Sequence, residues 1–285
     1  MTQFYCSSPA THVPPEHMLF PERVTSGVLV LCFVLGLPGN IAVLAVLICH
    51  LKEDCFTHRL MLNLAVSDLL TLLSLLLWIW TLLNSWTVGF VACKILSYEI
   101  YCYLYSSTLC VTLMNLQRYM QVLHPHICAK LGAREKKGFL CGIWMVSGVL
   151  ASYVLVQYTV GYDQNSQFQS CYPQFRSDTE LVATSLLEIV ILAIFFSLLV
   201  YFYCSVHRGV SQSPFFRRNR MTKLITRIVV VIFIFWIPIP IKNVFYGINI
   251  AGALVFINSC VNPFLYTFSL RERIMGGQMS ARVAG

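Results

Sequence analysis

The chain has 285 residues, of which 57% are hydrophobic and 11% are charged, and its formal net charge is +8. A soluble domain carries about 25% charged residues, so this composition excludes a chain that covers its own surface in water. It indicates that lipid is the solvent. The positive charge does not indicate a nucleic-acid partner, because its distribution follows membrane topology, as described below.

Polar and proline-containing residues begin the chain, and we expect residues 1–24 to form an extracellular amino terminus. A transmembrane helix needs about 20 apolar residues to cross roughly 30 Å of hydrocarbon. Only helices and closed barrels span lipid, and no alternating pattern is long enough to suggest a barrel. The predicted fold is all-α, an integral membrane bundle of seven helices within residues 25–270, followed by a cytoplasmic tail at 271–285. The spans are expected at 25–49, 60–83, 91–119, 139–160, 181–205, 224–246 and 250–269.

Lysine and arginine set the orientation, because short cytosolic loops are enriched in them. With the amino terminus outside, only four of the 20 basic residues fall on the outer side, namely Arg23, Lys94, Arg176 and Lys242. The sequence Arg217-Arg218-Asn219-Arg220, which precedes the sixth span, has two interpretations. Its arginines reflect this topological bias alone, or they also form a docking surface for a cytosolic partner and anionic lipid head groups.

Ionisable residues inside the membrane indicate functional sites, because a charge in hydrocarbon is costly. Asp68, Glu99 and Glu188 lie within the second, third and fifth spans. Asp68 is flanked by aliphatic residues and is expected to face the bundle interior, where a carboxylate among neutral oxygens suits a small hard cation. A protonated or hydrogen-bonded Asp68 is the alternative. The polar residues that other spans offer around it are Ser107, Asn258, Ser259 and Asn262.

Two prolines interrupt neighbouring spans. Pro238 and Pro263 each remove a backbone hydrogen bond and are expected to kink their helices. Such kinks are plausible hinges for a rocking motion. A static kink in a channel or transporter is the alternative.

Short motifs recur in order, one in each span or loop, and together they resemble the rhodopsin-like class of G-protein-coupled receptors. The resemblance covers essentially the whole chain. The residues that carry it are Gly39-Asn40, Asn63-Leu64-Ala65-Val66-Ser67-Asp68, Cys93, Gln117-Arg118-Tyr119, Pro125, Trp144, Cys171, Phe235-Trp236-Ile237-Pro238 and Asn262-Pro263-Phe264-Leu265-Tyr266.

The resemblance implies roles for these residues. Cys93 and Cys171 would form an outer disulfide, and Asp68 with Ser107, Asn258, Ser259 and Asn262 would hold sodium, the one cofactor expected. The activation switches would be Gln117, Arg118, Tyr119, Trp236, Pro238, Asn262, Pro263 and Tyr266. Heterotrimeric G proteins would dock at Arg118, Pro125, Arg217, Arg218, Arg220 and Lys223. The implied location is the plasma membrane, as a multi-pass protein in contact with membrane lipids.

A narrower set of residues is similar to leukotriene B4 and chemoattractant receptors, namely Gly36-Leu37-Pro38-Gly39-Asn40, Gly142-Ile143-Trp144, Cys171-Tyr172-Pro173 and Glu188. This implies that a leukotriene B4-like lipid acid is the extracellular ligand, with a peptide chemoattractant as the alternative. Ser97 stands where a histidine would be expected, and Lys94 and Lys242 could instead snorkel to the interface. The ligand-pocket candidates are Lys94, Ser97, Tyr101, Gln157, Tyr158, Glu188, Lys242 and Asn243.

The chain departs from the family pattern in two places. Gln117 stands where the family has an acid beside the arginine, and glutamine cannot neutralise Arg118. We therefore expect a weakened inactive state and raised ligand-free signalling. The stretch between Trp236 and Asn262 is short for two half-spans and a loop, since a helix rises 1.5 Å per residue, so a decoy that binds without signalling stays an alternative.

Other functional classes fit less well. The run 251–270 has no lysine, which excludes an opsin that binds retinal as a Schiff base. No internal repeat suggests a transporter, and the membrane acids lie on separate spans, which does not suit an intramembrane enzyme. Arrestin binding stays open, because Ser280 is the lone hydroxyl residue of the tail and Ser211 and Ser213 would have to be phosphorylated instead.

Overall fold

The computed structural model describes residues 16–49, 56–129, 132–162 and 169–211, together with four single residues of the last predicted span, Ile257, Ser259, Cys260 and Pro263. The predicted sixth span, 224–246, lies outside the described residues. The elements are α1 (Glu16–Cys49), α2 (Phe56–Asn84), α3 (Phe90–Leu123), α4 (Pro125–Ala129), α5 (Ala133–Ala151), α6 (Val154–Gln157), β1 (Tyr158–Tyr162), β2 (Gln169–Pro173) and α7 (Asp178–Ser211).

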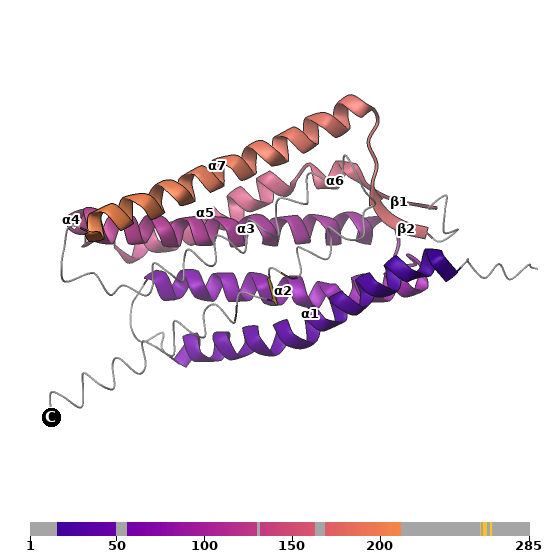
Figure 1. Cartoon of the computed structure of the whole chain (residues 1–285), viewed down its shortest axis with the longest axis horizontal. Helices are drawn as coiled ribbons and strands as arrows, with labels where there is room; N and C mark the ends of the chain where they lie inside the picture. Colours follow the sequence, from indigo (N-terminus) through magenta and orange to yellow (C-terminus); the bar gives the residue numbers. More distant parts are fainter. Residues whose placement is uncertain are drawn as a thin grey trace, which may run out of the picture.

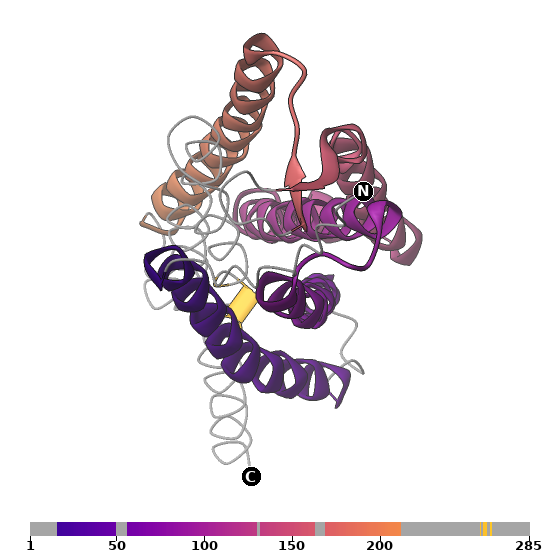
Figure 2. The same cartoon turned by 90° about the vertical axis from the view of Figure 1, so that its right-hand side faces the viewer.

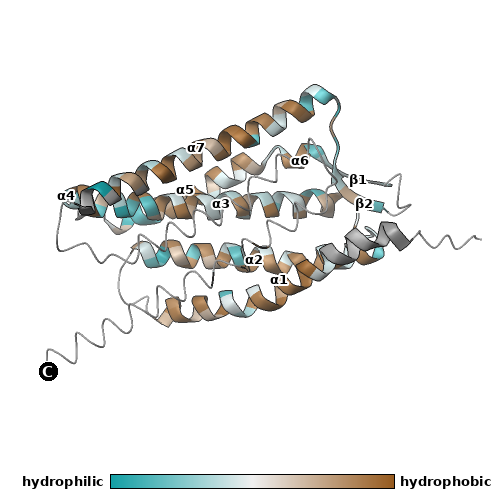
Figure 3. Ribbon diagram, in the orientation of Figure 1, coloured by the Kyte–Doolittle hydropathy of each residue, from teal (hydrophilic) through white to brown (hydrophobic). Residues whose placement is uncertain are grey.

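The long helices lie alongside one another as a bundle (Figure 1). Within the described residues, four spans are long and apolar enough to cross a membrane, at 26–49, 56–81, 133–157 and 178–206. Hydrophobic residues, brown in Figure 3, predominate along these helices, and many of them are exposed. Met145 and Val149, one turn apart on α5, are each 71% exposed. Such surfaces are unfavourable in water, and a lipid environment accounts for them.

Helix α3 is the central helix of the described bundle. It packs against α2, α4, α5, α6, α7 and β1, and the end view places it between α2 and α7 (Figure 2). Because protein surrounds α3 on several sides, it carries buried polar residues that a lipid-facing helix could not, including Ser106, Thr108 and Asn115.

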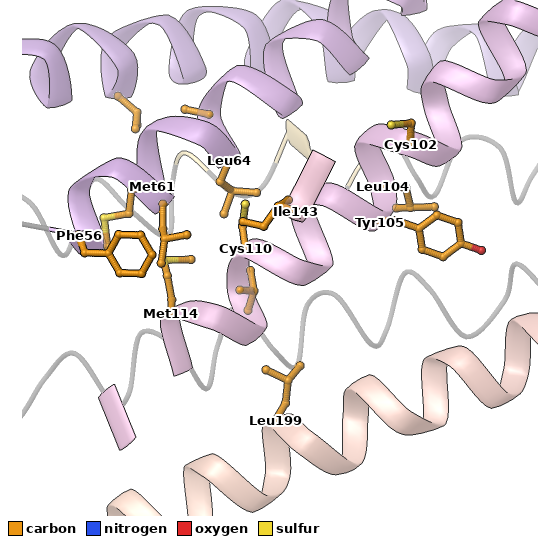
Figure 4. Close-up of a cluster of buried hydrophobic side chains, with 14 of the residues drawn as sticks. Phe56, Met61, Leu64, Cys102, Leu104, Tyr105, Cys110, Met114, Ile143 and Leu199 are labelled. Carbon is orange, nitrogen blue, oxygen red and sulfur yellow. The ribbon is translucent and has the colours of Figure 1, made fainter. Parts of the chain in front are cut away.

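The main core joins α2, α3, α5 and α7. Leu60 and Leu64 of α2 are fully buried against Cys110 of α3 and Ile143 of α5. Figure 4 shows Leu64, Cys110 and Ile143 gathered between their three helices, and Leu199 pointing toward them from α7. This packing fixes the helices relative to one another and so positions the polar groups described below.

Helix ends differ from the predicted spans. α1 begins at Glu16 rather than at residue 25, α3 runs on to Leu123 rather than 119, and α7 extends beyond both ends of the predicted 181–205. Apolar runs mark the membrane-crossing part, whereas backbone hydrogen bonds carry a helix on into polar residues. The predicted fourth span, 139–160, is wrong at its outer end, because the helix stops at Gln157 and the next residues form β1.

The outer end of the fourth span is reshaped by pairing with β2. Thr159 and Val160 are β-branched and favour a strand, and β1 pairs antiparallel with β2, with Val160 opposite Cys171. Before the strand, the helix tightens at Ser152 and Tyr153, where bonds such as that from the Leu155 N–H to the Ser152 carbonyl span three residues.

Two glycines let α1 approach the seventh span closely. A Cβ on Gly39 would lie 2.9 Å from Cβ of Pro263, and one on Gly36 would lie 3.1 Å from Cα of Cys260. We expect Gly39→Ala to cost about 1–3 kcal/mol through overpacking, because the proline ring cannot turn away. The melting temperature of the detergent-solubilised protein should fall. Gly27→Ala is the matched control, since a Cβ there meets nothing within 4 Å; equal melting temperatures for the two variants would contradict the close contact.

Candidate functional site

A disulfide fastens the β-hairpin to the first turn of α3. Cys93 and Cys171 are bonded with their Cα atoms 5.6 Å apart, and both are buried. The predicted disulfide is therefore confirmed. Since disulfides persist in oxidising compartments, the hairpin end of the bundle faces the outside, as the basic residues also indicate.

Beneath the hairpin lies a group of tyrosines, Tyr101, Tyr105, Tyr153 and Tyr158, which we call the tyrosine cluster. Tyr101 meets two of the other rings edge to face, that of Tyr153 at 5.9 Å and that of Tyr158 at 6.3 Å. Burial raises the pKa of Tyr158, on strand β1, to about 12, so its hydroxyl keeps its proton at neutral pH.

The tyrosine cluster contacts the buried carboxyl of Glu188 on α7 through Tyr153. The Tyr153 hydroxyl donates to Glu188 Oε1 at 2.7 Å, and the Tyr105 hydroxyl lies 3.5 Å from that of Tyr153. One turn away, Gln157 Nε2 donates to Thr184 Oγ1 at 2.8 Å. The two contacts join the fourth span to α7 through buried polar groups, which are costly in an apolar interior unless they are paired.

The structure brings together five of the ligand-pocket candidates, Ser97, Tyr101, Gln157, Tyr158 and Glu188. Ser97 is buried, with its hydroxyl 3.6 Å from Cys171 Sγ. Lys94 lies at the edge, where its ammonium donates to the Leu155 carbonyl and sits 4.8 Å from the centre of the Phe90 ring. A cation suits this helix end, because the carbonyls of a helix C-terminus carry negative partial charge. Lys242 and Asn243 lie outside the described residues.

Sequence reasoning missed Tyr105 and Tyr153 as site residues. Tyr105 follows Tyr101 by four positions, so the two share one helix face, and this spacing could have identified it. Tyr153 precedes Gln157 by four positions in the same way. Neither spacing indicates the carboxyl on α7 that Tyr153 contacts.

The interior polar site is described in part. Asp68 is fully buried, and Ser107 and Ser259 are 4% exposed. The hydroxyl oxygens of Ser67 and Ser106 lie 3.3 Å apart, within hydrogen-bond distance. This contact joins α2 to α3 beside Asp68. A buried carboxylate with buried hydroxyls fits the oxygen ligands of a small hard cation. Asn258 and Asn262 lie outside the described residues, within which no group of three or more His, Cys, Asp or Glu could hold a metal.

Nearby side-chain amides hold neighbouring helices together. Asn40 Nδ2 donates to the Ser259 carbonyl at 3.0 Å. Trp144 Nε1 donates to Asn63 Oδ1 at 2.8 Å, and Asn63 Nδ2 donates to Cys110 Sγ at 2.9 Å. These bonds tie α1 to the seventh span and join α5, α2 and α3.

At the opposite end of α3, Gln117, Arg118 and Tyr119 are partly buried. Thr57 Oγ1 of α2 donates to Gln117 Oε1 at 3.1 Å. Pro125 begins α4, a position where its missing N–H costs nothing. Pro263 is buried against Gly39. The remaining predicted switch and docking residues lie outside the described residues, namely Trp236, Pro238, Tyr266, Arg217, Arg218, Arg220 and Lys223.

Comparison with known proteins adds to this geometry. Residues 39–266 match the family described as 7 transmembrane receptor (rhodopsin family). The chain is 28% identical to apelin receptor B of Danio rerio, over 89% of this chain and 80% of that protein. It is also 28% identical to human leukotriene B4 receptor 1, over 81% and 72% respectively. Human C-C chemokine receptor type 8 is 27% identical, over 84% and 73%.

Proposed function

The chain belongs to the rhodopsin family of seven-transmembrane receptors, and from that premise we propose that its extracellular ligand is a leukotriene B4-like lipid mediator. As a member of this family it is a multi-pass plasma-membrane protein that couples an extracellular ligand to heterotrimeric G proteins, and it is not an enzyme. The proposal concerns the chemistry of the ligand.

The observation that carries the proposal is the tyrosine cluster with Glu188 beneath the hairpin. Phenol rings offer apolar faces together with hydroxyls, which suits a ligand that is largely apolar and carries a few hydroxyl groups. Glu188 would accept hydrogen bonds from such hydroxyls. Lys94, at the outer edge, would attract the carboxylate of a lipid acid. The resemblance to leukotriene B4 receptors supports the same class of ligand.

A peptide chemoattractant is the second candidate, and Glu188 is the observation that favours it. A buried carboxyl among aromatic rings can also hold a cation, through an ion pair and through cation–π contacts. A basic group of a peptide would then replace the hydroxyl groups of a lipid acid. The similarity to apelin and chemokine receptors accords with this alternative.

Glu188→Gln separates the two candidates. The amide oxygen still accepts from Tyr153, but the side chain loses its charge. We expect the potency of leukotriene B4 to stay the same or rise. The potency of a basic peptide agonist would fall roughly tenfold or more, because a charge-assisted hydrogen bond is worth about 1.5–3 kcal/mol.

The measurement is agonist-induced G-protein activation, normalised to surface expression of an epitope-tagged receptor. Glu99→Gln is the matched control, since Glu99 is a partly buried acid of α3 outside the tyrosine cluster. No response to leukotriene B4 together with a peptide response that Glu188→Gln weakens would replace the lipid proposal by the peptide one.

The other proposed contacts are a sodium ion and intracellular partners. Sodium would be held by Asp68, Ser107 and Ser259, which fit its oxygen chemistry, with Asn258 and Asn262. The basic group Arg217, Arg218, Arg220 and Lys223 would meet the G protein and anionic lipids, with Arg118 and Pro125 beside it. Arrestin binding would depend on phosphorylation of Ser211 and Ser213.

A further inference from the structure

The cytosolic end of α3 has an uncharged side chain beside Arg118. Gln117 accepts a hydrogen bond from Thr57, so it links α3 to α2 without supplying a negative charge. An acid at this position would hold the arginine through a charge-assisted bond, which is roughly twice as strong as a neutral one. The neutral side chain of Gln117 cannot provide that charge-assisted restraint.

Aromatic rings join α3 to α7 at the same end. The Tyr119 ring lies 5.5 Å from that of Phe202 and 6.1 Å from that of Tyr201. Tyr201 and Phe202 are themselves 5.6 Å apart, measured between ring centres. We call Tyr119, Tyr201 and Phe202 the aromatic clamp.

Each member of the aromatic clamp has a different environment. Phe202 is 9% exposed and faces the bundle, whereas Tyr201 is 55% exposed. The Tyr119 ring also lies 5.6 Å from that of His124, just after α3 ends. Tyr119 therefore contacts the end of its own helix as well as two successive residues of α7.

We propose that the aromatic clamp restrains the resting receptor by holding the cytosolic ends of α3 and α7 together, in place of the ion pair that Gln117 cannot make. Tyr119 acts as a positioning residue, because it fixes where α7 lies relative to Arg118. This inference rests on family membership and on the ring contacts, and it does not depend on which ligand the receptor binds.

Leucine substitutions test the aromatic clamp, because leucine keeps apolar bulk and helix propensity. Tyr119→Leu removes the two ring pairs that Tyr119 makes with α7, with Tyr201 and Phe202, and each pair contributes a few-fold to the closed state. We expect ligand-free G-protein activation to rise about fivefold in Tyr119→Leu and about threefold in Tyr201→Leu. The rise in ligand-free activation in the Tyr119→Leu/Tyr201→Leu double variant should not exceed the product of the two single rises. Both substitutions remove the same Tyr119–Tyr201 ring pair. Tyr119→Phe keeps the rings and should change activation less than twofold.

The controls separate the restraint from folding and from contact with the G protein. Activation is divided by surface expression, and Val200→Leu tests a neighbouring residue of α7 that is 40% exposed and outside the clamp. Tyr201 lies on α7, so Tyr201→Leu tests the aromatic clamp from the other helix. It gives a result even if Tyr119→Leu does not reach the cell surface. Unchanged or lowered ligand-free activation in Tyr201→Leu, at normal surface expression, would overturn the proposal.

Discussion

Cys93→Ser is expected to abolish the ligand response and to reduce surface expression severely. The disulfide joins positions 78 residues apart, and closing a loop of that length stabilises a fold by about 4.5 kcal/mol in the chain-entropy model. It also holds β2 against α3, with Ser97 beside Cys171. Without it, the hairpin above the tyrosine cluster loses its covalent anchor.

The matched control for the disulfide is Cys141→Ser, which removes an exposed free cysteine of α5. Surface epitope staining and agonist-induced G-protein activation are measured for both variants. Cys171→Ser should behave like Cys93→Ser, and the double variant should be no worse than either single one. A normal agonist response from surface-expressed Cys93→Ser would show that the hairpin does not depend on the bond.

Gln117→Asp is expected to lower ligand-free G-protein activation about tenfold. The new carboxylate lies next to Arg118, and a charge-assisted hydrogen bond in a partly buried site contributes about 1–3 kcal/mol. Aspartate is one methylene shorter than glutamine, so the bond from Thr57 Oγ1 is not kept at its present length, and the asparagine variant shares this change. The closed state gains stability, and fewer receptors are open without ligand.

Gln117→Asn is the control that isolates charge, because asparagine has the shape of aspartate without its charge. It should leave ligand-free activation near that of the unmodified receptor. Activation per surface receptor is measured without agonist in each case. Equal activation in the Asp and Asn variants would mean that the charge beside Arg118 does not set the resting state.

The class of fold was predictable because its physical signals are strong. Long apolar runs identify helices that cross lipid, and the basic residues set their orientation. The burial of Asp68 also followed from the sequence, since a carboxyl within a span avoids hydrocarbon. The disulfide between Cys93 and Cys171 came from the family resemblance rather than from the chemistry of the residues alone.

The outer site was less predictable because α7, which carries Glu188, is apolar on most of its sides. A helix that faces lipid on one side and the core on the other lacks the polar face that shows its rotation. The sequence therefore did not indicate that Tyr153 donates to Glu188, with Tyr105 beside Tyr153. Likewise, the apolar run 139–160 gave no sign that Tyr158 begins a strand, since pairing with residues far along the chain decides that.

Guanine-nucleotide exchange by a purified heterotrimeric G protein, with the receptor reconstituted in vesicles, shows whether the receptor activates a G protein. We expect faster exchange than in empty vesicles even without ligand, and a further acceleration by leukotriene B4 or a peptide agonist. The receptor must be folded and carry the Cys93–Cys171 bond. If exchange then stays at the rate of empty vesicles, with and without agonists, the protein does not activate G proteins.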